Sequence, residues 1–264
     1  SELLARRAIE VLAEVTTSLT QALGDGAPPP PKAAPVALVA AAEALCAAQG
    51  GDVAYLIPLL GSLSADRVKA LLPKLVAQPQ EQFRLALDNL LASDPPKPLS
   101  PSEILVALHD VDPARDNVSL KRIIESCSEC FERPHSFPAE ALAAALQRMV
   151  EFTPLPLLFM RTVIQAETAA PSLREFTLGL LRTLARRQVW KMDAKIWEGW
   201  MRCAKRATPR SFPVLCAELP VAPLEELLGK FPALRDPLRA YAAAPAVASS
   251  IPRAVATLLA GGAV

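Results

Sequence analysis

Prolines standing between helical hydrophobic patterns most constrain what this chain can fold into. The 264 residues include 26 prolines and 10 glycines, and a proline inside a helix removes a backbone hydrogen bond and clashes with the preceding turn. Apolar residues recur at three- and four-residue spacing over stretches of about 10 to 16 residues, and prolines separate these stretches. No segment alternates well enough to be a strand. The pattern predicts an all-α, HEAT-like α-solenoid of stacked antiparallel helix pairs.

Capping residues locate several helix starts. Ser64 precedes one helical pattern, and Ser100-Pro101-Ser102-Glu103 has the form of a capping box with proline at the first helical position. Thr153-Pro154 and Thr208-Pro209 repeat the combination of a capping residue and a proline, so we expect helices to begin there too. Another helix is predicted from Asn117 to Phe131.

Patterning divides the chain into four parts. We expect an N-terminal helix over residues 1–23, a Pro-rich linker over 24–35, a helical-repeat domain over 36–260 and a short tail over 261–264. The linker contains four consecutive prolines, which favour a stiff and extended spacer. The chain begins at Ser1 within a helical pattern, which suggests a domain cut from a longer protein.

Composition excludes several classes of protein. Hydrophobic residues make up 52% of the chain and charged residues 21%, which is enough to drive collapse into a core. No run of 18 apolar residues lacks a proline or a charge, so no membrane span is predicted. The five cysteines are an odd set without a signal peptide before them, so we expect free thiols in a reducing compartment.

Signatures of enzymes are scarce. The sequence lacks a phosphate-binding loop, a dinucleotide-binding glycine pattern, an H-E-x-x-H motif and a nucleophile elbow, and it has two histidines. We therefore predict no catalytic residue, no cofactor and no enzymatic activity.

One spacing has a metal-binding alternative. Cys127 and Cys130 are followed by His135, and His109 is a conceivable fourth ligand of a zinc ion. The two cysteines are three residues apart on a predicted helix, however, and this spacing places both on one face, as in a protein core. A second cysteine pair is missing, so we favour packing over metal binding.

The segment from Arg182 to Arg210 carries a strong local charge. It holds nine Lys and Arg residues against two acidic residues, a net charge of +7 in a chain whose total is +1. All three tryptophans, Trp190, Trp197 and Trp200, lie in it. Basic residues interleaved with aromatics could bind single-stranded RNA. A protein-binding basic groove and a plain solvated helix face are the other two interpretations.

Four stretches of the sequence closely resemble the C-terminal domain of symplekin. They are LSPSEILVALHDVD at 99–112, PLPLLFMRTVIQ at 154–165, RQVWKMDAKIWEGWMRCAKRATPRSFPVLCAELP at 187–220 and FPALRDPLRAY at 231–241. The K-x-W-E-G-W and T-P-x-S-F-x-V-L phrases within the third stretch are the most specific. The resemblance runs from about residue 50 to 258.

This resemblance implies a non-enzymatic scaffold of the nuclear pre-mRNA 3′-end processing machinery, acting in polyadenylation and in histone mRNA cleavage. The implied partners are the metallo-β-lactamase-type endonuclease of the cleavage and polyadenylation specificity factor and its inactive paralogue. An RNA-binding solenoid remains the alternative function.

Local charge and aromatic content suggest which residues face the partner. Aromatics and arginines are enriched in protein interfaces. The predicted partner-binding residues are Arg161, Arg187, Trp190, Lys191, Arg202, Lys205 and Arg206. The five cations from Arg187 onward should lie mostly on the outer face of the protein, because the apolar residues Ile196, Trp197, Trp200 and Met201 should occupy the inner face.

The hydrophobic spacing also predicts core residues. We expect the following side chains to be buried: Leu72, Leu105, Val163, Leu180, Leu181, Trp197 and Leu215.

Overall fold

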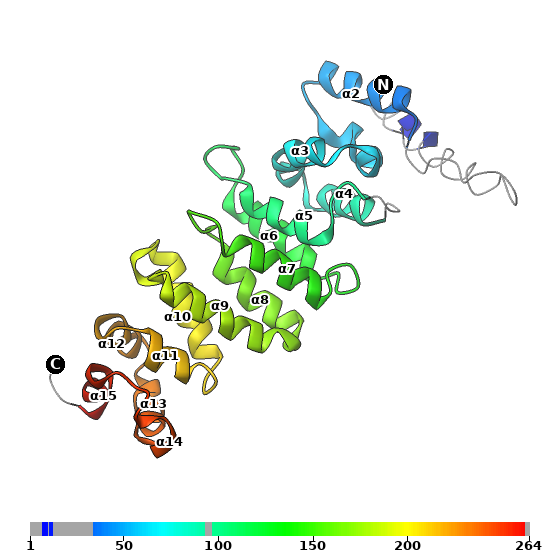
Figure 1. Ribbon diagram of the computed structural model, residues 1–264. Helices are drawn as coiled ribbons and strands as arrows, with labels where there is room; N and C mark the ends of the chain where they lie inside the picture. Colours follow the sequence, from blue (N-terminus) through cyan, green and yellow to red (C-terminus); the bar gives the residue numbers. More distant parts are fainter. Residues whose placement is uncertain (1–6, 10, 13–33, 93–96, 262–264) are drawn as a thin grey trace, which may run out of the picture. The chain divides into compact units, whose positions relative to one another are not determined.

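The computed structural model describes residues 7–9, 11–12, 34–92 and 97–261 (Figure 1). Most of the predicted N-terminal helix and most of the predicted linker lie outside these ranges, as do the last three residues of the predicted tail. Residues 7–9 and 11–12, which fall within the predicted N-terminal helix, are helical.

The described residues form α-helices joined by turns and short 3-10 helices, with no strand among them, which confirms the predicted all-α fold (Figure 1). No helix in the described ranges is both long and apolar enough to cross a membrane. The chain divides into two compact units, Ser1–Phe137 and Pro138–Val264, which we call the first and second units.

The first unit is a stack of amphipathic helices. Its elements are α2 (Val36–Ala48), η1 (Val53–Tyr55), η2 (Ile57–Ser62), α3 (Ala65–Ala77), α4 (Gln80–Ala92), α5 (Pro101–Asp110) and α6 (Leu120–Phe131). Helices α3 and α6 contact each other, each of them also contacts α4 and α5, and η2 packs on α4. The Ser64 hydroxyl accepts a hydrogen bond from the backbone N–H of Arg67, and Ser100 with Glu103 forms the predicted capping box.

Helix α6 begins three residues later than predicted. Asn117 has a positive φ of 52°, so it cannot belong to a right-handed helix. The hydroxyl of Ser119 accepts a hydrogen bond from the backbone N–H of Arg122 and starts the helix at Leu120.

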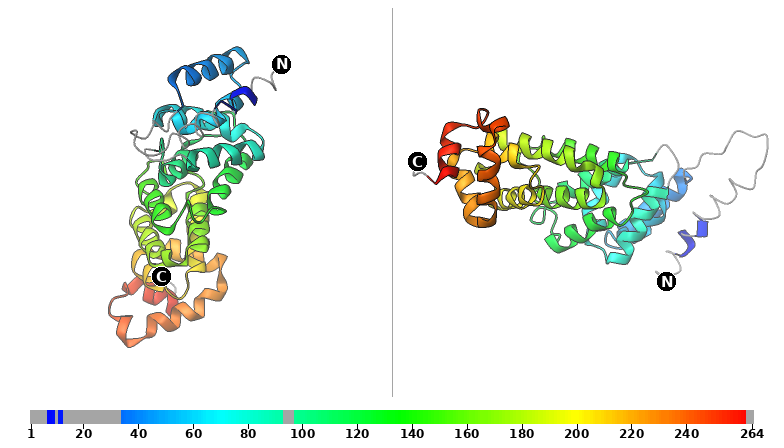
Figure 2. Two further views of the ribbon diagram at one scale, coloured as in Figure 1. Left: turned by 90° about the vertical axis from the view of Figure 1, so that its right-hand side faces the viewer. Right: turned by 90° about the horizontal axis from the view of Figure 1, so that it is seen from below.

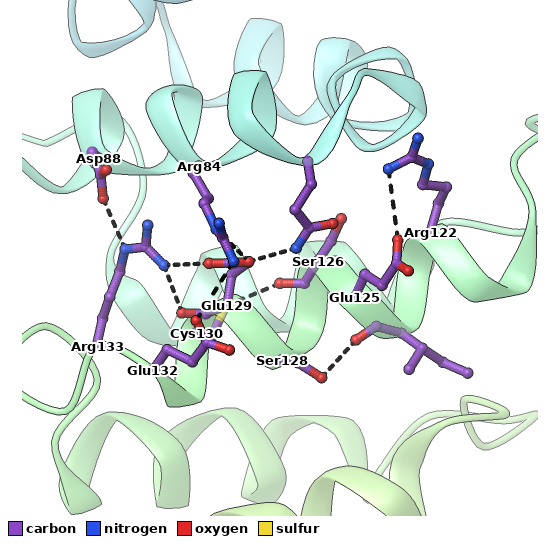
Figure 3. A network of polar contacts seen from close by, with 12 residues as sticks. Arg84, Asp88, Arg122, Glu125, Ser126, Ser128, Glu129, Cys130, Glu132 and Arg133 are labelled. Atoms are coloured by element: carbon purple, nitrogen blue, oxygen red, sulfur yellow. Dashed lines mark hydrogen bonds and ion pairs between the residues drawn. The ribbon is translucent and has the colours of Figure 1, made fainter.

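A buried carboxylate connects α4 with the end of α6 (Figure 3). Glu129 is 2% exposed, and its Oε1 accepts hydrogen bonds from the Gln80 amide and from Arg84 Nε, the latter at 2.8 Å. Arg133 Nη1 donates to Glu129 Oε2 at 2.9 Å while its Nε donates to Asp88 at 2.8 Å. Burial raises the pKa of Glu129, but hydrogen bonds from Arg133, Gln80 and Arg84 outweigh it and hold this pKa below its usual value. The carboxylate therefore stays ionised inside the first unit at neutral pH.

The second unit repeats the stacking. Its helices are α7 (Ala139–Met149), α8 (Phe159–Ala169), η3 (Pro171–Leu173), α9 (Arg174–Arg186), η4 (Val189–Lys191), α10 (Ala194–Arg206), α11 (Phe212–Glu218), α12 (Val221–Lys230), η5 (Pro232–Leu234), α13 (Arg235–Ala243), α14 (Pro245–Ala248) and α15 (Arg253–Ala260). Contacts join α7 to α8 and α8 to α9. Others join α8 to α10, α9 to α11 and α11 to α13 (Figure 2). Contacts between each helix and the next but one are what a stack of helix pairs requires.

Two predicted helix starts in this unit are wrong. Thr153-Pro154 and Thr208-Pro209 are cis peptide bonds within turns, and the next helices begin only at Phe159 and Phe212. The Thr208 hydroxyl donates back to the carbonyl of Lys205 at 2.8 Å, so this side chain closes α10 instead of capping α11.

The predicted core positions are confirmed. The following residues, drawn from both units, are each at most 5% exposed: Leu72, Leu105, Val163, Leu180, Leu181, Trp197 and Leu215. The hydrophobic stripes therefore face the interior, as the three- and four-residue spacing predicts.

Candidate docking surface

Tryptophan packing fixes α10 and η4 within the second unit. Trp200 is fully buried, and its Nε1 donates a hydrogen bond to the carbonyl of Leu181 at 3.0 Å. Trp197 is also buried and stacks on Trp200 with ring centroids 5.3 Å apart. Trp190 meets Trp197 edge-on at 6.5 Å and is only half-buried. Trp190 is thus the one tryptophan with ring surface left for a partner.

Gly199 lets α8 and α10 approach closely. A Cβ atom at this position would lie 2.6 Å from Met160 Cβ, well inside van der Waals contact. The K-x-W-E-G-W phrase at 195–200 therefore has a packing explanation: two buried tryptophans flank the glycine at which α10 touches α8.

Gly199→Ala should lower the free energy of unfolding by about 1 to 3 kcal/mol, because Met160 Cβ is attached to the backbone and cannot simply rotate away. Urea denaturation followed by tryptophan fluorescence measures this, since all three tryptophans are in the second unit. Gly179→Ala on α9 is the matched control, because nothing lies within 4 Å of the point that its Cβ atom would occupy. It should instead stabilise the protein by up to about 1 kcal/mol. If both variants changed the free energy of unfolding in the same direction, the close contact between Gly199 and Met160 would be contradicted.

Exposed cations form a strip along α10. Lys195, Arg202 and Arg206 are exposed and stand at i, i+7 and i+11, which places them within about 40° of arc on a helix. The Arg206 guanidinium donates to the Thr168 hydroxyl of α8 at 2.9 Å. Arg161 is exposed and lies seven residues before Thr168, on the same strip of α8. Arg206 of α10 therefore lies beside the strip of α8 that carries Arg161.

We call the exposed cations of α8, η4 and α10 the basic face: Arg161, Lys191, Lys195, Arg202, Lys205 and Arg206. The predicted outer position is therefore confirmed for Lys191, Arg202, Lys205 and Arg206. Lys195 was not among the predicted site residues, although its spacing of seven from Arg202 would have identified it. The second unit as a whole has sixteen Lys and Arg residues against ten acidic residues, a net charge of +6.

Glu198 and Lys205 connect α10 to the end of α12. Glu198 accepts hydrogen bonds from Lys230 at 2.9 Å and from Arg202 at 2.8 Å. The hydrogen bond from Lys230, reinforced by the charge of Arg202, lowers the pKa of Glu198. The Lys205 ammonium lies 5.2 Å from the centre of the Phe231 ring, a cation–π contact.

Arg187 is the exception to the predicted outer position. Its side chain is half-buried, and its guanidinium donates to the carbonyls of Val150 and Phe152 and to the Thr153 hydroxyl. These acceptors belong to the turn after α7. Arg187 therefore holds that turn in place, and its side chain is less exposed than the cations of the basic face are.

Further cations of the +7 segment are neutralised locally. Arg186 donates to both carboxylate oxygens of Glu218, and Arg182 Nε lies 3.5 Å from the same carboxylate. The hydrogen bond to Glu218 raises the pKa of Arg186. These two arginines join α9 to α11 and are not part of the basic face.

The candidate zinc ligands are not gathered at one point. Cys127 and Cys130 are buried on one face of α6, and burial raises the pKa of Cys130 well above its usual value. His109 Nδ1 is bonded to the carbonyl of Leu105 at 2.8 Å, and His135 is exposed in a turn. Over the ranges that the structure describes, no three His, Cys, Asp or Glu side chains are placed to hold a metal ion. All five cysteines are buried free thiols.

A protein-family model described as the symplekin tight junction protein C terminal matches residues 52–231 of the chain. The match covers more than half of the sequence and includes α8, η4 and α10. No solved structure matches the chain.

Proposed function

Because the chain belongs to the symplekin C-terminal family, we propose that it is a non-enzymatic scaffold domain in nuclear pre-mRNA 3′-end processing. Scaffolding in 3′-end processing is the role that the family suggests. Its partners are the metallo-β-lactamase-type endonuclease subunit of the cleavage and polyadenylation specificity factor and the inactive paralogue of that subunit.

The observation that best supports this proposal is the basic face, whose cations stand on firmly packed elements. Its cations project from α8, η4 and α10, while Trp197, Trp200 and Gly199 fix these elements from the inside. A preorganised surface loses less conformational freedom on binding than a mobile one does. Long cationic side chains beside the half-buried Trp190 suit an interface that is partly apolar and partly electrostatic.

Reversing three cations of the basic face tests the proposal. Lys191→Glu, Lys195→Glu and Arg202→Glu together should weaken capture of the two nuclease-family subunits at least tenfold, because like charges across an interface repel. Lys205 is left unchanged because its ammonium packs on Phe231. The melting temperature should stay nearly constant, since all three side chains are exposed.

A control triple variant removes the same charge elsewhere. Lys69→Glu, Lys121→Glu and Arg253→Glu reverse three exposed cations outside the basic face and should leave capture unchanged. If the first triple variant captured the subunits as well as the wild type does, or if both triple variants lost capture equally, the interface would have to lie on another surface.

RNA binding is less well supported than protein docking. Single-stranded RNA is bound by stacking bases on exposed aromatics, and Trp197 and Trp200 are 5% and 0% exposed. A salt titration distinguishes the two functions, because contacts to several phosphates would make the affinity fall steeply with salt.

A further inference from the structure

A cleft at the ends of α8 and α10 contains three arginines. It has a volume of about 480 Å³ and lies within the second unit. Arg174 is the first residue of α9, Arg206 is the last residue of α10, and Arg210 stands in the turn before α11. Arginines from three separate elements thus line one cavity.

These arginines are poorly neutralised. Glu167 is the single acidic residue lining the cleft, so the lining carries a net charge of +2. Within the described part of the chain none of the three arginines forms an ion pair, whereas Arg182 and Arg186 nearby in sequence share Glu218. Arg206 uses one nitrogen on Thr168 and keeps its other donors for a ligand.

The turn that bears Arg210 is held firmly against α10. The buried hydroxyl of Ser211 donates to the carbonyl of Ala204 at 2.7 Å, and the Ser211 N–H donates to the carbonyl of Ala207 at 3.2 Å. The Thr208 hydroxyl adds its bond to the Lys205 carbonyl. The wall of the cleft is therefore formed before any ligand arrives, which favours binding.

We propose that this cleft binds a phosphorylated serine or threonine side chain in a segment of a protein partner. A phosphate monoester carries a charge of about −1.5 to −2 and three acceptor oxygens at neutral pH. One such group would neutralise the +2 lining and offer one oxygen to each guanidinium, whereas one carboxylate would neutralise only half of it. Arginine forms stronger and more directional bonds to phosphate than lysine does.

The remaining lining suits a peptide better than a nucleic acid. Leu178, Ala207 and Pro209 supply apolar contacts for the chain on either side of the phosphate. The lining contains no aromatic ring on which a base could stack. The apolar lining and the lack of an aromatic ring in it therefore both favour a phosphopeptide over RNA.

This site does not depend on the identity of the docking partner proposed above. The probe is an acetylated and amidated alanine pentapeptide with a central phosphoserine, compared by fluorescence anisotropy with the same peptide carrying serine. We expect the phosphorylated peptide to bind at least tenfold more tightly. Arg174→Gln together with Arg210→Gln should reduce this preference to about twofold or less.

Two controls make the experiment decisive. Arg148→Gln with Arg253→Gln removes two exposed cations of the second unit that lie outside both the cleft and the basic face, and it should leave the preference unchanged. A uridine trinucleotide, which carries two phosphate charges, should bind more weakly than the phosphopeptide does. Equal binding of the two peptides, equal losses in the two double variants, or tighter binding of the trinucleotide would overturn the proposal. Each outcome leaves the capture experiment on the basic face intact.

Discussion

Replacing Arg84 and Arg133 together with methionine should lower the free energy of unfolding by about 3 to 5 kcal/mol at pH 7. The variant leaves Glu129, which is 2% exposed, with the Gln80 amide as its remaining side-chain partner (Figure 3). A buried carboxylate without a compensating cation is costly because its hydration is lost. Urea denaturation followed by far-UV circular dichroism measures the change, and hydrogen exchange at the amides of α4 and α6 locates it.

The loss should depend on pH with a defined sign. In the wild type the pKa of Glu129 is lower in the folded than in the unfolded state, so its contribution is complete above the unfolded pKa of about 4.3. That contribution disappears as the pH falls through the folded pKa. In the variant, protonation at low pH removes the uncompensated charge. The stability difference between wild type and variant should therefore shrink between pH 7 and pH 4.

Lys121→Met with Arg122→Met is the matched control. Both residues lie on α6, and both pair at 3.6 to 3.7 Å with Glu125, which is more exposed than Glu129. Removing these two cations should cost less than about 1 kcal/mol, because such pairs remain hydrated. A loss as large as that of the first variant, or one that grows toward pH 4, would contradict the role assigned to Glu129.

Trp200→Ala should lower the free energy of unfolding by about 3 to 5 kcal/mol. The indole is fully buried, stacks on Trp197 and donates to the carbonyl of Leu181, so its removal leaves a cavity and takes one hydrogen bond from that carbonyl. Urea denaturation with far-UV detection checks the value.

Trp190→Ala tests the same aromatic cluster at its edge. Trp190 is half-buried and meets Trp197 only edge-on, so its loss should cost about 1 kcal/mol. It should nevertheless weaken capture of the nuclease-family subunits, whereas Trp200→Ala acts mainly on stability. Equal costs for the two substitutions would show that the cluster does not anchor α10 as described.

Local patterns predicted the helices because the causes of those helices are local. The capping box at Ser100 and the buried positions of Trp197 and Trp200 each follow from spacings of three or four residues. Thr153 and Thr208 have the same local chemistry as true caps, but the chain turns away after each of them. Capping chemistry is therefore not sufficient to start a helix.

Long-range polar contacts could not be predicted in the same way. Arg187 looked like an outer cation, but its acceptors lie more than thirty residues earlier, at Val150 and Phe152. Glu129 stands on the buried face of α6 beside Cys130, a position that a charge normally avoids. Its partners on α4 are at least 45 residues away in sequence. The spacing of residues along the sequence does not predict these long-range hydrogen bonds, because they form only when the helices pack together.

The sequence pattern does not reveal the cleft, because the arginines that line it are far apart in the sequence. Arg174 and Arg210 are 36 positions apart, and no helical spacing relates them. Only the packing of α8, α9 and α10 brings them to one cavity. An arginine that lines such a cleft can be identified from the residues packed around it in space, but not from the residues next to it in the sequence.

The most direct test of the scaffold account is size-exclusion chromatography of this chain mixed with the C-terminal domains of the endonuclease subunit and its inactive paralogue. We expect the three chains to elute together at micromolar concentration and about 150 mM salt, a physiological ionic strength, without RNA and without any metal added to the chain described here. Separate elution under these conditions, combined with RNA binding that weakens steeply with salt, would contradict the account and favour an RNA-binding solenoid.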